Sequence, residues 1–557
     1  MIKSSLIMSV FLASSLSVCA QTQKGQTISG EAPGDKFGSS LSMPNSNTIA
    51  IGAYFNQGAA PYAGHVRVYD WNGGNWGQRG IDLDGVDAGD WFGYSVFMPD
   101  ENTLAVGSPR SDVGGAEAGI AQVFEWNGSN WDQKGSSLIG EASGDEFGVT
   151  VDMPNTNTIA VGAWKNAGTA TSAGHVRIFD WNGVDWVQKG SDIDGEALGD
   201  FSGCAISMPD ENTIAIGAYL NADGGNHAGQ VRVYNWNGSA WIQKGVDIEG
   251  VVESYTGYSV EMPDANTLAI GANAHDDADV DAGKLRIYDW NGSSWVQLGS
   301  DIDGDGLYAN CGFSVAMPNP KTVLVSMVNK STNSLNKNGE VRLYRWDIST
   351  NDWMQTVSIT GANTYDWLGW DVSMPDDNTI AMGATEGGNG PGYVQVFDIC
   401  DVNTNVTDNW GILTSSANAA AYQWLDCDNG YAPIAGANAQ SFLPTANGSY
   451  AVEVTENGCI DTSSCTLVNW VGIDELTSDK LITVHPNPSE GVINLHLNDT
   501  NEDVSVSVYS TTGALVFHEK IGNKKEHVLN LTDRQGIYII EVELTHGTIA
   551  RERVILK

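Results

Sequence analysis

Alternating aspartates form the clearest candidate for a metal site. Asp277, Asp279 and Asp281 place carboxylates at every second position, and hard cations such as Ca²⁺ prefer oxygen ligands of this kind. The segment is one residue longer than the usual Asp-x-Asp-x-Asp-Gly loop and lacks the Glu that commonly follows such a loop. Two hypotheses therefore stay open, a Ca²⁺ site at these aspartates and a solvated acidic loop. No other cofactor is predicted.

Motifs for catalysis give little support to an enzyme. The sequence has no Gly-x-Ser-x-Gly nucleophile segment and no His-Glu-x-x-His metal helix. His65 and His175 occupy the same position of an internal repeat, and a residue that recurs in this way is expected to be structural. Acidic pairs are abundant, and no pair stands out as a general acid and base. We predict a non-enzymatic protein, with a hydrolase that uses such acids as the alternative.

Charge and composition narrow the classes of partner. The 557 residues include 27 Lys and Arg against 68 Asp and Glu, and the net charge is −41. Nucleic-acid binding needs a basic surface, so this class is largely excluded, and anionic membrane surfaces are disfavoured. The 65 glycines and 19 tryptophans suit short strands joined by tight turns. Residues 480–557 are nearly neutral, which is a first sign of a separate C-terminal module.

The dipeptide Met-Pro marks the internal repeat. It recurs about every 55 residues, at Met43, Met98, Met153, Met208, Met262, Met317 and Met374. Each copy contains four short strand patterns. We expect the first, Tyr94–Met98 in the second copy, to end at its proline, which cannot donate to a ladder. The third, such as His65–Trp71, alternates clearly and precedes an Asn-Gly turn. Seven copies of four strands predict a seven-bladed β-propeller.

The two ends of the repeat region predict how the ring closes. The strand-four pattern also occurs before the first copy, at Gln23–Gly30, whereas the last copy stops at Val394–Asp398 without a fourth strand. An open array would leave a bare edge at each end. We therefore expect Lys24–Gly30 to pair with Gly392–Asp398 and to close the ring. A linear solenoid is the alternative.

The repeat also resembles a known family. Phe-Gly-x-Ser-Val followed by Ile-Ala-Ile-Gly-Ala is similar to the FG-GAP repeat of integrin α-type propellers, as in Phe37-Gly38 with Ile51-Gly52-Ala53. The resemblance covers about residues 21–400. It implies the propeller fold and a ligand face, without naming a ligand. The Ca²⁺ loop that this family often carries is replaced by short turns such as Pro209–Thr213, so calcium at that position is not implied.

Loops of the repeat differ in how much they vary between copies. Turns between strands one and two, and between three and four, are uniform and share one face. Loops between strands two and three diverge and share the other face with the linkers between blades: Tyr54–Ala63, Ser108–Ala118, Trp164–Ala173, Tyr219–Ala228, Asn273–Ala282, Met327–Asn338 and Thr385–Pro391. A ligand without sevenfold symmetry needs unlike loops, so we predict this variable face as the binding face, with unconstrained drift as the alternative. Tryptophan pairs such as Trp71 and Trp76 are expected to pack across their hairpin, with a sugar-stacking platform as the alternative.

The N-terminus has the pattern of an export signal. Lys3 precedes an apolar stretch, Leu6–Leu16, that is too short to span a bilayer. We predict residues 1–20 as a signal peptide that is cleaved between Ala20 and Gln21. A lipid anchor on Cys19 is the alternative. No later segment reaches the ~18 apolar residues that a membrane helix needs.

A second module is indicated after the repeats. Four cysteines suggest disulfides in an exported protein, with three pairings open: Cys400, Cys427, Cys459 and Cys465. Residues 401–472 resemble an immunoglobulin-like β-sandwich. Ala421–Leu425 resembles its strand C with the core tryptophan, and Asn447–Val454 resembles its strand F with the tyrosine corner. The resemblance implies a spacer domain.

Residues 473–557 carry the most specific motif of the chain. Its residues are Pro486, Asn487, Pro488, Gly491, Gly513, Gly536 and Tyr538. The segment is similar to the C-terminal sorting domain of the Bacteroidetes type IX secretion system. In that family the domain is a seven-stranded sandwich that the outer-membrane translocon reads and that is then usually removed. The resemblance implies the type IX machinery as a partner and a secreted or outer-membrane surface location.

These patterns predict an all-β, exported protein for binding or adhesion. The expected order is a signal peptide at 1–20, a seven-bladed propeller at 21–400, and two β-sandwich domains at 401–472 and 473–557. The propeller is the expected head for an extracellular glycan or protein ligand. No nucleic-acid partner and no transmembrane helix are expected. A secreted glycan-active hydrolase and a structural surface component are the alternatives.

Overall fold

The computed structural model describes residues 20–557 except 333, 386–389, 401, 410–411, 419–420, 457–458, 469–481, 499–502, 512 and 545–548. The chain divides into two compact units, Met1–Asp401 and Val402–Lys557. The described residues form β-strands and their connections, with one 3₁₀ turn at Cys427–Asn429. No helix among them is long and apolar enough to cross a membrane. The predicted signal peptide lies outside the described residues except for Ala20, where β1 begins.

Seven antiparallel sheets make up the described part of the first unit. Sheet 1 contains β3 (Ser40–Asn45), β4 (Thr48–Ala53), β5 (His65–Trp71), β6 (Trp76–Gln78) and β7 (Leu83–Asp84); sheet 2 contains β8 (Ser95–Asp100), β9 (Thr103–Ser108), β10 (Ile120–Trp126), β11 (Trp131–Gln133) and β12 (Leu138–Ile139); sheet 3 contains β13 (Thr150–Asn155), β14 (Thr158–Ala163), β15 (His175–Trp181), β16 (Trp186–Gln188) and β17 (Ile193–Asp194); sheet 4 contains β18 (Ala205–Asp210), β19 (Thr213–Ala218), β20 (Gln230–Trp236), β21 (Trp241–Gln243) and β22 (Ile248–Glu249). Sheet 5 contains β23 (Thr256–Asp264), β24 (Thr267–Ala272), β25 (Lys284–Trp290), β26 (Trp295–Gln297) and β27 (Ile302–Asp303); sheet 6 contains β28 (Cys311–Asn319), β29 (Thr322–Met327), β30 (Glu340–Asp347) and β31 (Asp352–Thr360); sheet 7 contains β32 (Leu368–Asp376), β33 (Thr379–Ala384), β34 (Tyr393–Cys400), β1 (Ala20–Gln23) and β2 (Ile28–Ser29).

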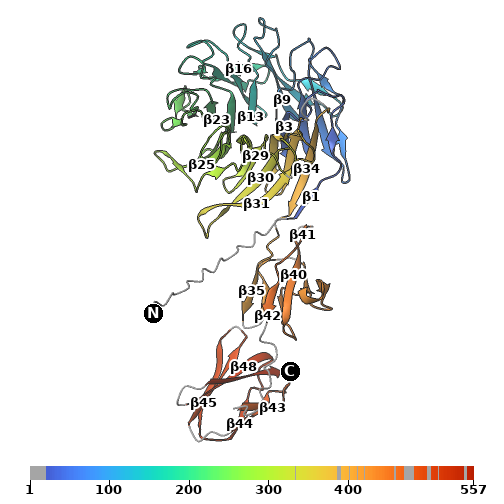
Figure 1. Ribbon diagram of the computed structural model, residues 1–557, viewed down its shortest axis with the longest axis vertical. Coiled ribbons are helices and arrows are strands. Elements are labelled where there is room, and N and C mark those ends of the chain that lie inside the picture. The colour runs from blue at the N-terminus through green and yellow to red at the C-terminus, as the bar shows by residue number, and fades with distance from the viewer. Residues whose placement is uncertain are drawn as a thin grey trace, which may run out of the picture. The chain divides into compact units, whose positions relative to one another are not determined.

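The first strands of these sheets form the inner wall of a closed ring. Each first strand contacts the first strand of the next sheet, and β32 contacts β3. Side chains tie the wall together: Ser42 Oγ accepts a hydrogen bond from Met98 N (2.9 Å), and Asp371 Oδ2 accepts one from Leu41 N (2.7 Å). In Figure 1, β3 and β13 lie near the middle of the ring and β25 and β31 lie toward its rim. This arrangement is that of a β-propeller-like fold.

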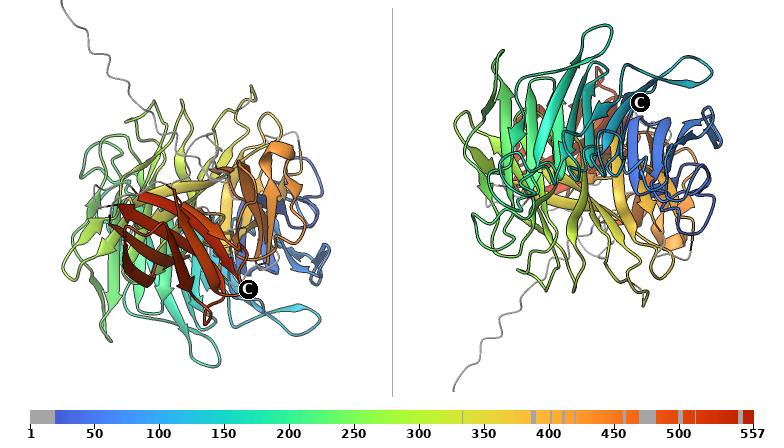
Figure 2. Two further views of the ribbon diagram at one scale, coloured as in Figure 1. Left: turned by 90° about the horizontal axis from the view of Figure 1, so that it is seen from below. Right: turned by 90° about the horizontal axis from the view of Figure 1, so that it is seen from above.

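The predicted pairing between the two ends of the repeat region is confirmed. β1 pairs with β34 from Ala20–Cys400 to Gln23–Phe397, and β2 continues the ladder with Ile28 opposite Val394. Ile28 is buried in a cluster that includes Val394. The blue beginning and the yellow-to-orange end of this unit accordingly lie side by side in both views of Figure 2. The last sheet therefore takes its outer strands from the beginning of the chain.

The structure corrects the expected end of the first strand in each copy. β8 runs through Pro99 to Asp100 instead of stopping at Met98. The register against β9 shifts between Phe97 and Asp100, and such a bulge removes the need for a ladder hydrogen bond from the proline. The turn that follows is short, because Asn102 N donates to Asp100 Oδ1 (2.9 Å).

The outer strand of a sheet is split where the next sheet packs against it. Gly80 lies between β6 and β7 with a φ of +80°, and a Cβ there would lie 2.8 Å from Trp126 Cζ3. Trp126 lies opposite Trp131 across its own hairpin, and the two ring centroids are 5.4 Å apart. The predicted cross-strand packing of the tryptophan pairs is therefore confirmed. The pairs also hold neighbouring sheets together, since Trp131 Nε1 donates to Arg79 O (3.3 Å).

The first part of the second unit contains two sheets among its described residues. One has β35 (Val406–Asn409), β36 (Ile412–Ser415) and β39 (Ser441–Phe442), and the other has β37 (Ala421–Asp426), β38 (Ala432–Pro433), β40 (Gly448–Glu456), β41 (Cys459–Thr462) and β42 (Thr466–Val468). Trp424 is fully buried, and its Nε1 donates to Ala439 O (2.9 Å). Tyr450 OH donates to Ala446 O (2.8 Å). Trp424 is therefore a core residue of this module, and Tyr450 is fixed to a backbone carbonyl four residues before it.

One predicted disulfide is present in the described part of the chain. It joins Cys427 to Cys465, with Cα atoms 6.3 Å apart. The side chains of Cys400 and Cys459 lie outside the described residues. Cys204 and Cys311 are free, and burial raises the pKa of each thiol to about 12. Both thiols therefore stay protonated at neutral pH and act as small apolar groups.

The C-terminal residues form two further sheets with a shared core. The strands are β43 (Ile482–His485), β44 (Val492–Leu497) and β47 (Glu526–Asn530) in one sheet, and β45 (Val504–Ser510), β46 (Leu515–Gly522), β48 (Gly536–Leu544) and β49 (Ile549–Leu556) in the other. Buried side chains of both sheets belong to one hydrophobic cluster. Asn487 fixes the segment after β43 onto β49, because its Nδ2 donates to Arg553 O (2.6 Å) and its Oδ1 accepts from Ile555 N (2.9 Å).

The predicted motif residues of this segment have structural positions. Pro486 and Pro488 flank Asn487, and Gly491 has a φ of +104° with Thr532 Cα only 2.4 Å from a Cβ placed there. Gly513 and Gly536 also have positive φ, at +77° and +113°. Tyr538 packs against the shared core. The motif therefore specifies tight backbone approaches and turns of this small fold.

Candidate functional site

A pocket opens on the face that carries the variable loops. Its volume is about 520 Å³, and its lining is Phe55, Tyr62, Ala88, Gly89, Trp91, Arg110, Asp112 and Glu117. Three segments contribute these residues: the loop after β4, the linker from β7 to β8 and the loop after β9. Two of them are the divergent loops Tyr54–Ala63 and Ser108–Ala118. The pocket thus lies on the face where binding is predicted, between sheets 1 and 2.

The linker holds Trp91 in an uncommon backbone conformation. Trp91 has a φ of +60°, in the left-handed region that few non-glycine residues adopt. Hydrogen bonds fix this turn: Asp90 Oδ2 accepts from Asp87 N (3.2 Å), and Asp90 O accepts from Arg110 N (3.3 Å). The same repeat position is left-handed in the other copies, at Lys36, Glu146, Phe201, Tyr255, Asn310 and Trp367. The fold therefore repeats this strained position, and the copies differ in the side chain that it holds.

Arg110 supplies the positive charge of the pocket. Its guanidinium lies 3.9 Å from the ring centroid of Trp91, in a cation–π contact. It also forms an ion pair with Glu117 (3.2 Å) and lies 3.8 Å from Glu146. Its Nε is buried and has no hydrogen-bond partner among the described residues. The side chain as a whole is 35% exposed and lines the pocket, so its accessible donors are candidate contacts for a ligand oxygen.

Glu146 connects the pocket to the next sheet. Its side chain is buried, yet its Oε1 accepts from Lys165 Nζ (2.7 Å) and its Oε2 accepts from Trp164 Nε1 (2.6 Å). Arg110 completes the set of cations around it. The carboxylate therefore orients a lysine, a tryptophan and the pocket arginine at once.

Aromatic side chains extend from the pocket around the variable face. Tyr54 contacts Trp91 and Tyr94, with centroid distances of 5.6 and 5.2 Å. A second series has neighbouring centroids 5.2–6.5 Å apart and consists of Trp164, Phe201, Tyr219, Tyr255, Tyr258, Phe313, Trp367 and Trp370. These rings are half-buried. Partly exposed aromatic faces of this kind are suited to stacking against a ligand.

Three carboxyl groups on the inner wall have pKa values above the usual range. They are Asp152 in β13, Glu261 in β23 and Asp371 in β32. Burial raises the pKa of Asp152 to about 7, of Glu261 to about 8 and of Asp371 to about 6. Asp152 Oδ2 accepts from Met208 N (2.6 Å), which joins β13 to β18. None of the three lines the pocket described above.

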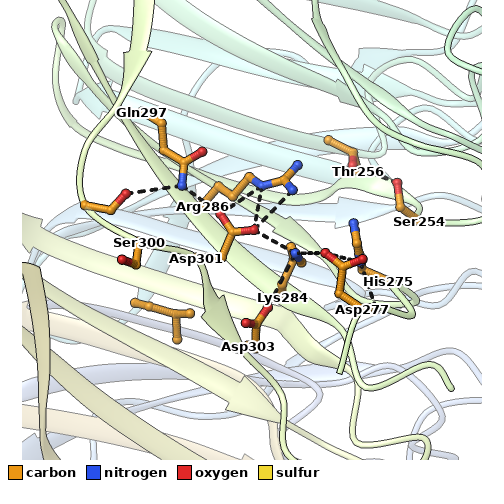
Figure 3. Close-up of polar contacts among 12 residues, drawn as sticks. Ser254, Thr256, His275, Asp277, Lys284, Arg286, Gln297, Ser300, Asp301 and Asp303 are labelled. Atoms are coloured by element: carbon orange, nitrogen blue, oxygen red, sulfur yellow. Dashed lines mark hydrogen bonds and ion pairs between the residues drawn. The ribbon is translucent and has the colours of Figure 1, made fainter. Parts of the chain in front are cut away.

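The predicted Ca²⁺ loop directs its acidic groups to different partners. Asp277 points toward Lys284 in Figure 3 and accepts from its Nζ at 2.7 Å. Asp281 N donates to Asp276 Oδ1 (2.7 Å), and the carbonyl of Asp279 accepts from Ala282 N (3.0 Å). These three aspartates do not form one of the clusters of convergent ligand atoms found among the described residues. In this arrangement the carboxylate of Asp277 is engaged by Lys284, and the Ca²⁺ hypothesis for this loop stays a prediction.

The two repeated histidines lie among carboxylates. Ligand atoms of Glu31, His65 and Asp82 lie within 4.8 Å of one another, and so do those of Glu141, His175 and Asp192. Burial lowers the pKa of both imidazoles. Their recurrence in the sequence indicated a structural role, and their position next to acidic groups was not expected.

Aromatic residues of the variable face were also not expected from the loops alone. The position after the glycine of each Phe-Gly or equivalent dipeptide holds Ser39, Tyr94, Val149, Cys204, Tyr258, Phe313 and Trp370. Aromatic residues occupy four of these seven positions, although the surrounding strand pattern does not change. This variation at one repeat position is the signal in the sequence that marks the aromatic series.

Comparison with protein families assigns the C-terminal segment. Residues 483–557 match the model described as the secretion system C-terminal sorting domain. This segment is a C-terminal sorting domain. The resemblance found in the sequence is thereby confirmed. The sorting domain implies handling by the type IX secretion machinery and indicates a secreted or outer-membrane surface protein.

Solved structures resemble the chain at low sequence identity. A periplasmic gluconolactonase of Pseudomonas aeruginosa is 12% identical with a TM-score of 0.40, and the match covers 59% of this chain and 86% of that chain. The β-propeller domain of the Trilobed protease of Pyrococcus furiosus is 10% identical with a TM-score of 0.38, and the match covers 67% and 94%. No curated protein matches the sequence. The activities in these names carry no argument about this chain.

Proposed function

We propose that this protein is an exported binding protein whose first unit holds a ligand in the pocket between sheets 1 and 2. The observation that carries the proposal is the combination of Trp91, Arg110 and Glu117 in one pocket on the variable face. Aromatic surface and a small number of directed polar groups are typical of binding sites. The sorting domain supports export, so the ligand is extracellular.

Our proposal for the architecture assigns each module a task. Residues 21–400 form a seven-bladed propeller of the FG-GAP type, supported by seven sheets in a ring and by the closure through β1 and β2. Residues 401–472 form an immunoglobulin-like spacer, supported by buried Trp424 and by the hydrogen bond from Tyr450 to Ala446 O. Residues 473–557 form a sandwich that contains the sorting domain. Residues 1–20 are a cleaved signal peptide.

Glycans are the ligand class that the pocket chemistry favours. Trp91 and Tyr62 offer aromatic surface to the C–H faces of a sugar ring, because the aromatic face is negative. The Arg110 side chain lines the pocket and is 35% exposed, so its accessible donors can bind a hydroxyl or carboxylate oxygen. Asp112 and Glu117 provide acceptors for hydroxyl groups. A pocket of about 520 Å³ is large enough for a drug-sized ligand, which spans a small number of sugar rings.

A binding role fits the pocket better than hydrolysis. The Glu117 carboxylate is already engaged in an ion pair with Arg110 (3.2 Å). The three inner-wall carboxyl groups whose pKa is raised most, Asp152, Glu261 and Asp371, do not line the pocket. The proposal is therefore a non-enzymatic protein that binds, and adheres to, an extracellular glycan surface.

An array of glycans and matrix proteins tests the proposal. The full chain is expected to bind a limited set of glycans, and Arg110→Ala is expected to weaken that binding at least about tenfold, as loss of a charged hydrogen bond does. Arg79→Ala is the matched control, because Arg79 also stacks on a tryptophan but on the uniform face. Equal binding by both variants, or no binding by the wild type, would contradict the proposal. Release of free sugar from a bound glycan would instead support the hydrolase alternative.

A further inference from the structure

The first residue of the third strand is a basic side chain in sheets 1, 3 and 5. His65, His175 and Lys284 are equivalent, because they lie opposite Ala53, Ala163 and Ala272 in the ladders of sheets 1, 3 and 5. In sheet 5 the side chain of Lys284 is only 2% exposed. Its Nζ lies 2.6, 2.7 and 3.4 Å from carboxylate oxygens of Asp301, Asp277 and Asp303. Figure 3 shows this nitrogen between the three carboxylates.

In sheet 1 an arginine provides the positive charge. Arg67 donates to both carboxylate oxygens of Asp82, at 2.9 and 2.7 Å, and it also pairs with Glu31. Asp82 corresponds to Asp301 of sheet 5, since each lies two residues before the partner of the first strand-three residue. The acidic groups beside His65 are therefore already neutralised by a neighbouring side chain.

Sheet 3 has the same acidic groups with a different arginine geometry. Arg177 donates through Nη2 to Ile139 O, and its Nη1 lies 3.7 Å from Glu141. Its Nε is buried without a hydrogen-bond partner among the described residues. Arg67 makes a two-point contact with Asp82, whereas no arginine makes such a contact with Asp192 among the described residues. The hydrogen bond that Asp192 accepts there comes from Gln188 Nε2 (2.6 Å). Its second oxygen faces His175.

His175 is a buried and unsatisfied group at the base of this cluster. Its side chain is 1% exposed, and its Nδ1 lies 3.7 Å from Asp192 Oδ2 and 4.0 Å from Asp194 Oδ1, which is too long for hydrogen bonds. Its Nε2 has no partner among the described residues. Ligand atoms of Glu141, His175 and Asp192 lie within 4.8 Å of one another. The Nδ1 side of the imidazole thus faces two carboxylates beyond hydrogen-bond distance, and the nitrogen without a partner is Nε2.

We propose that Glu141, His175 and Asp192 bind one divalent transition-metal ion, for which Zn²⁺ is the best fit. One imidazole with two carboxylates is a ligand set for such ions, whereas Ca²⁺ prefers oxygen ligands alone. The carboxylates are more exposed than the imidazole, so the ion enters from solvent and keeps a position for water. Zinc–ligand bonds of about 2.0–2.2 Å place ligand atoms about 3.3 Å apart, so the exposed carboxylates must close around the ion. Because Glu141 follows β12 and the others belong to sheet 3, the ion links two sheets.

Calorimetric titration of the untagged full chain with Zn²⁺ tests the site. We expect one ion per chain, and an affinity loss of at least about 100-fold in His175→Lys and in Asp192→Asn, since removing even an outer partner of a metal ligand lowers affinity by about 10–100-fold. His175→Lys recreates the lysine of sheet 5, so the fold is expected to persist with the ammonium in place of the metal. His65→Lys is the matched control at the equivalent position and is expected to leave Zn²⁺ binding unchanged.

Each outcome of the titration decides for or against the site. Loss of binding in both sheet 3 variants with retention in His65→Lys establishes it, and the melting temperature of each metal-free variant shows that it is folded. Titration with Co²⁺ adds a second readout, because its visible absorption reports the ligands and should disappear in His175→Lys. The proposal is overturned when the wild type binds no Zn²⁺, when Asp192→Asn binds it as tightly, or when His65→Lys removes it as well.

Discussion

Closure of the ring by the N-terminal segment makes a quantitative prediction for Ile28. The side chain is 4% exposed and lies in a cluster with Phe37, Val394 and Val396. Replacing it by alanine removes about 2 kcal/mol of burial, and the cavity left behind brings typical losses for buried isoleucine to about 2–5 kcal/mol. We expect Ile28→Ala to lower the free energy of unfolding of the first unit by about 3 kcal/mol.

Ile81→Ala is the matched control for this prediction. Ile81 belongs to the same segment of the repeat but is 72% exposed, so the change should alter the free energy of unfolding by about 0.5 kcal/mol or less. Urea unfolding followed by tryptophan fluorescence reports the first unit, which holds most of the 19 tryptophans. Deletion of residues 21–30 should lower the stability further, because it removes β2 and exposes the edge of β34.

Two results would refute the closure argument. One is an equal loss of stability in Ile28→Ala and Ile81→Ala, which would mean that Ile28 does not contribute to the core as its burial indicates. The other is an unchanged unfolding curve after deletion of residues 21–30. Either result would show that the last sheet is complete without the N-terminal strands.

Further predictions concern export, the disulfide and the inner wall. Deletion of residues 483–557 should leave the protein folded in the periplasm of a host with the type IX system, and protease digestion of intact cells should then fail to reach it; surface exposure of the truncated protein would argue against the sorting role. Cys427→Ser should lower the stability of the second unit by about 4 kcal/mol, since the disulfide closes a loop with a sequence separation of 38; equal thermal unfolding of the variant and the wild type would argue against this. Because the pKa of Asp152 is about 7 in the folded state and about 4 when unfolded, the folded state binds more protons and its stability falls as pH rises from about 4 to 7. Asp152→Asn should therefore raise the melting temperature more at pH 8 than at pH 4, and an equal change at both pH values would contradict the buried carboxyl.

Strand positions could be predicted where the local pattern is strong. The expected third strand His65–Trp71 is identical to β5, because clear alternation and an Asn-Gly turn define both of its ends. The first strand was expected to stop before Pro99, and this was wrong because the proline lies in a bulge. A bulge depends on the register with the partner strand, which local sequence does not contain.

The candidate site could be placed on a face but not resolved into residues. Divergent loops indicated the variable face, yet the pocket also needs Trp91 from a linker, held by a left-handed turn. Asp277 was interpreted with its neighbouring aspartates because their spacing suggested Ca²⁺, whereas the fold pairs it with Lys284. Spacing along the chain does not show which cation lies across the loop.

Repetition also concealed a difference between equivalent positions. His65 and His175 recur at one position and were expected to be structural for that reason. Their neighbours differ in space: Arg67 contacts Asp82, while Arg177 turns to the carbonyl of Ile139. Since both arginines have the same sequence position, only the three-dimensional arrangement separates the two clusters.

The most direct test of the proposed site measures how tightly two tyrosine variants bind a glycan that the array has identified. Tyr62 lines the pocket and is 48% exposed, whereas Tyr308 is 53% exposed and does not line it. Neither change should disturb folding, so calorimetry at 25 °C reports the contact alone. We predict that Tyr62→Ala weakens binding about tenfold, equivalent to about 1.4 kcal/mol, and that Tyr308→Ala binds as the wild type does. Equal affinities of the two variants would contradict a ligand site between sheets 1 and 2.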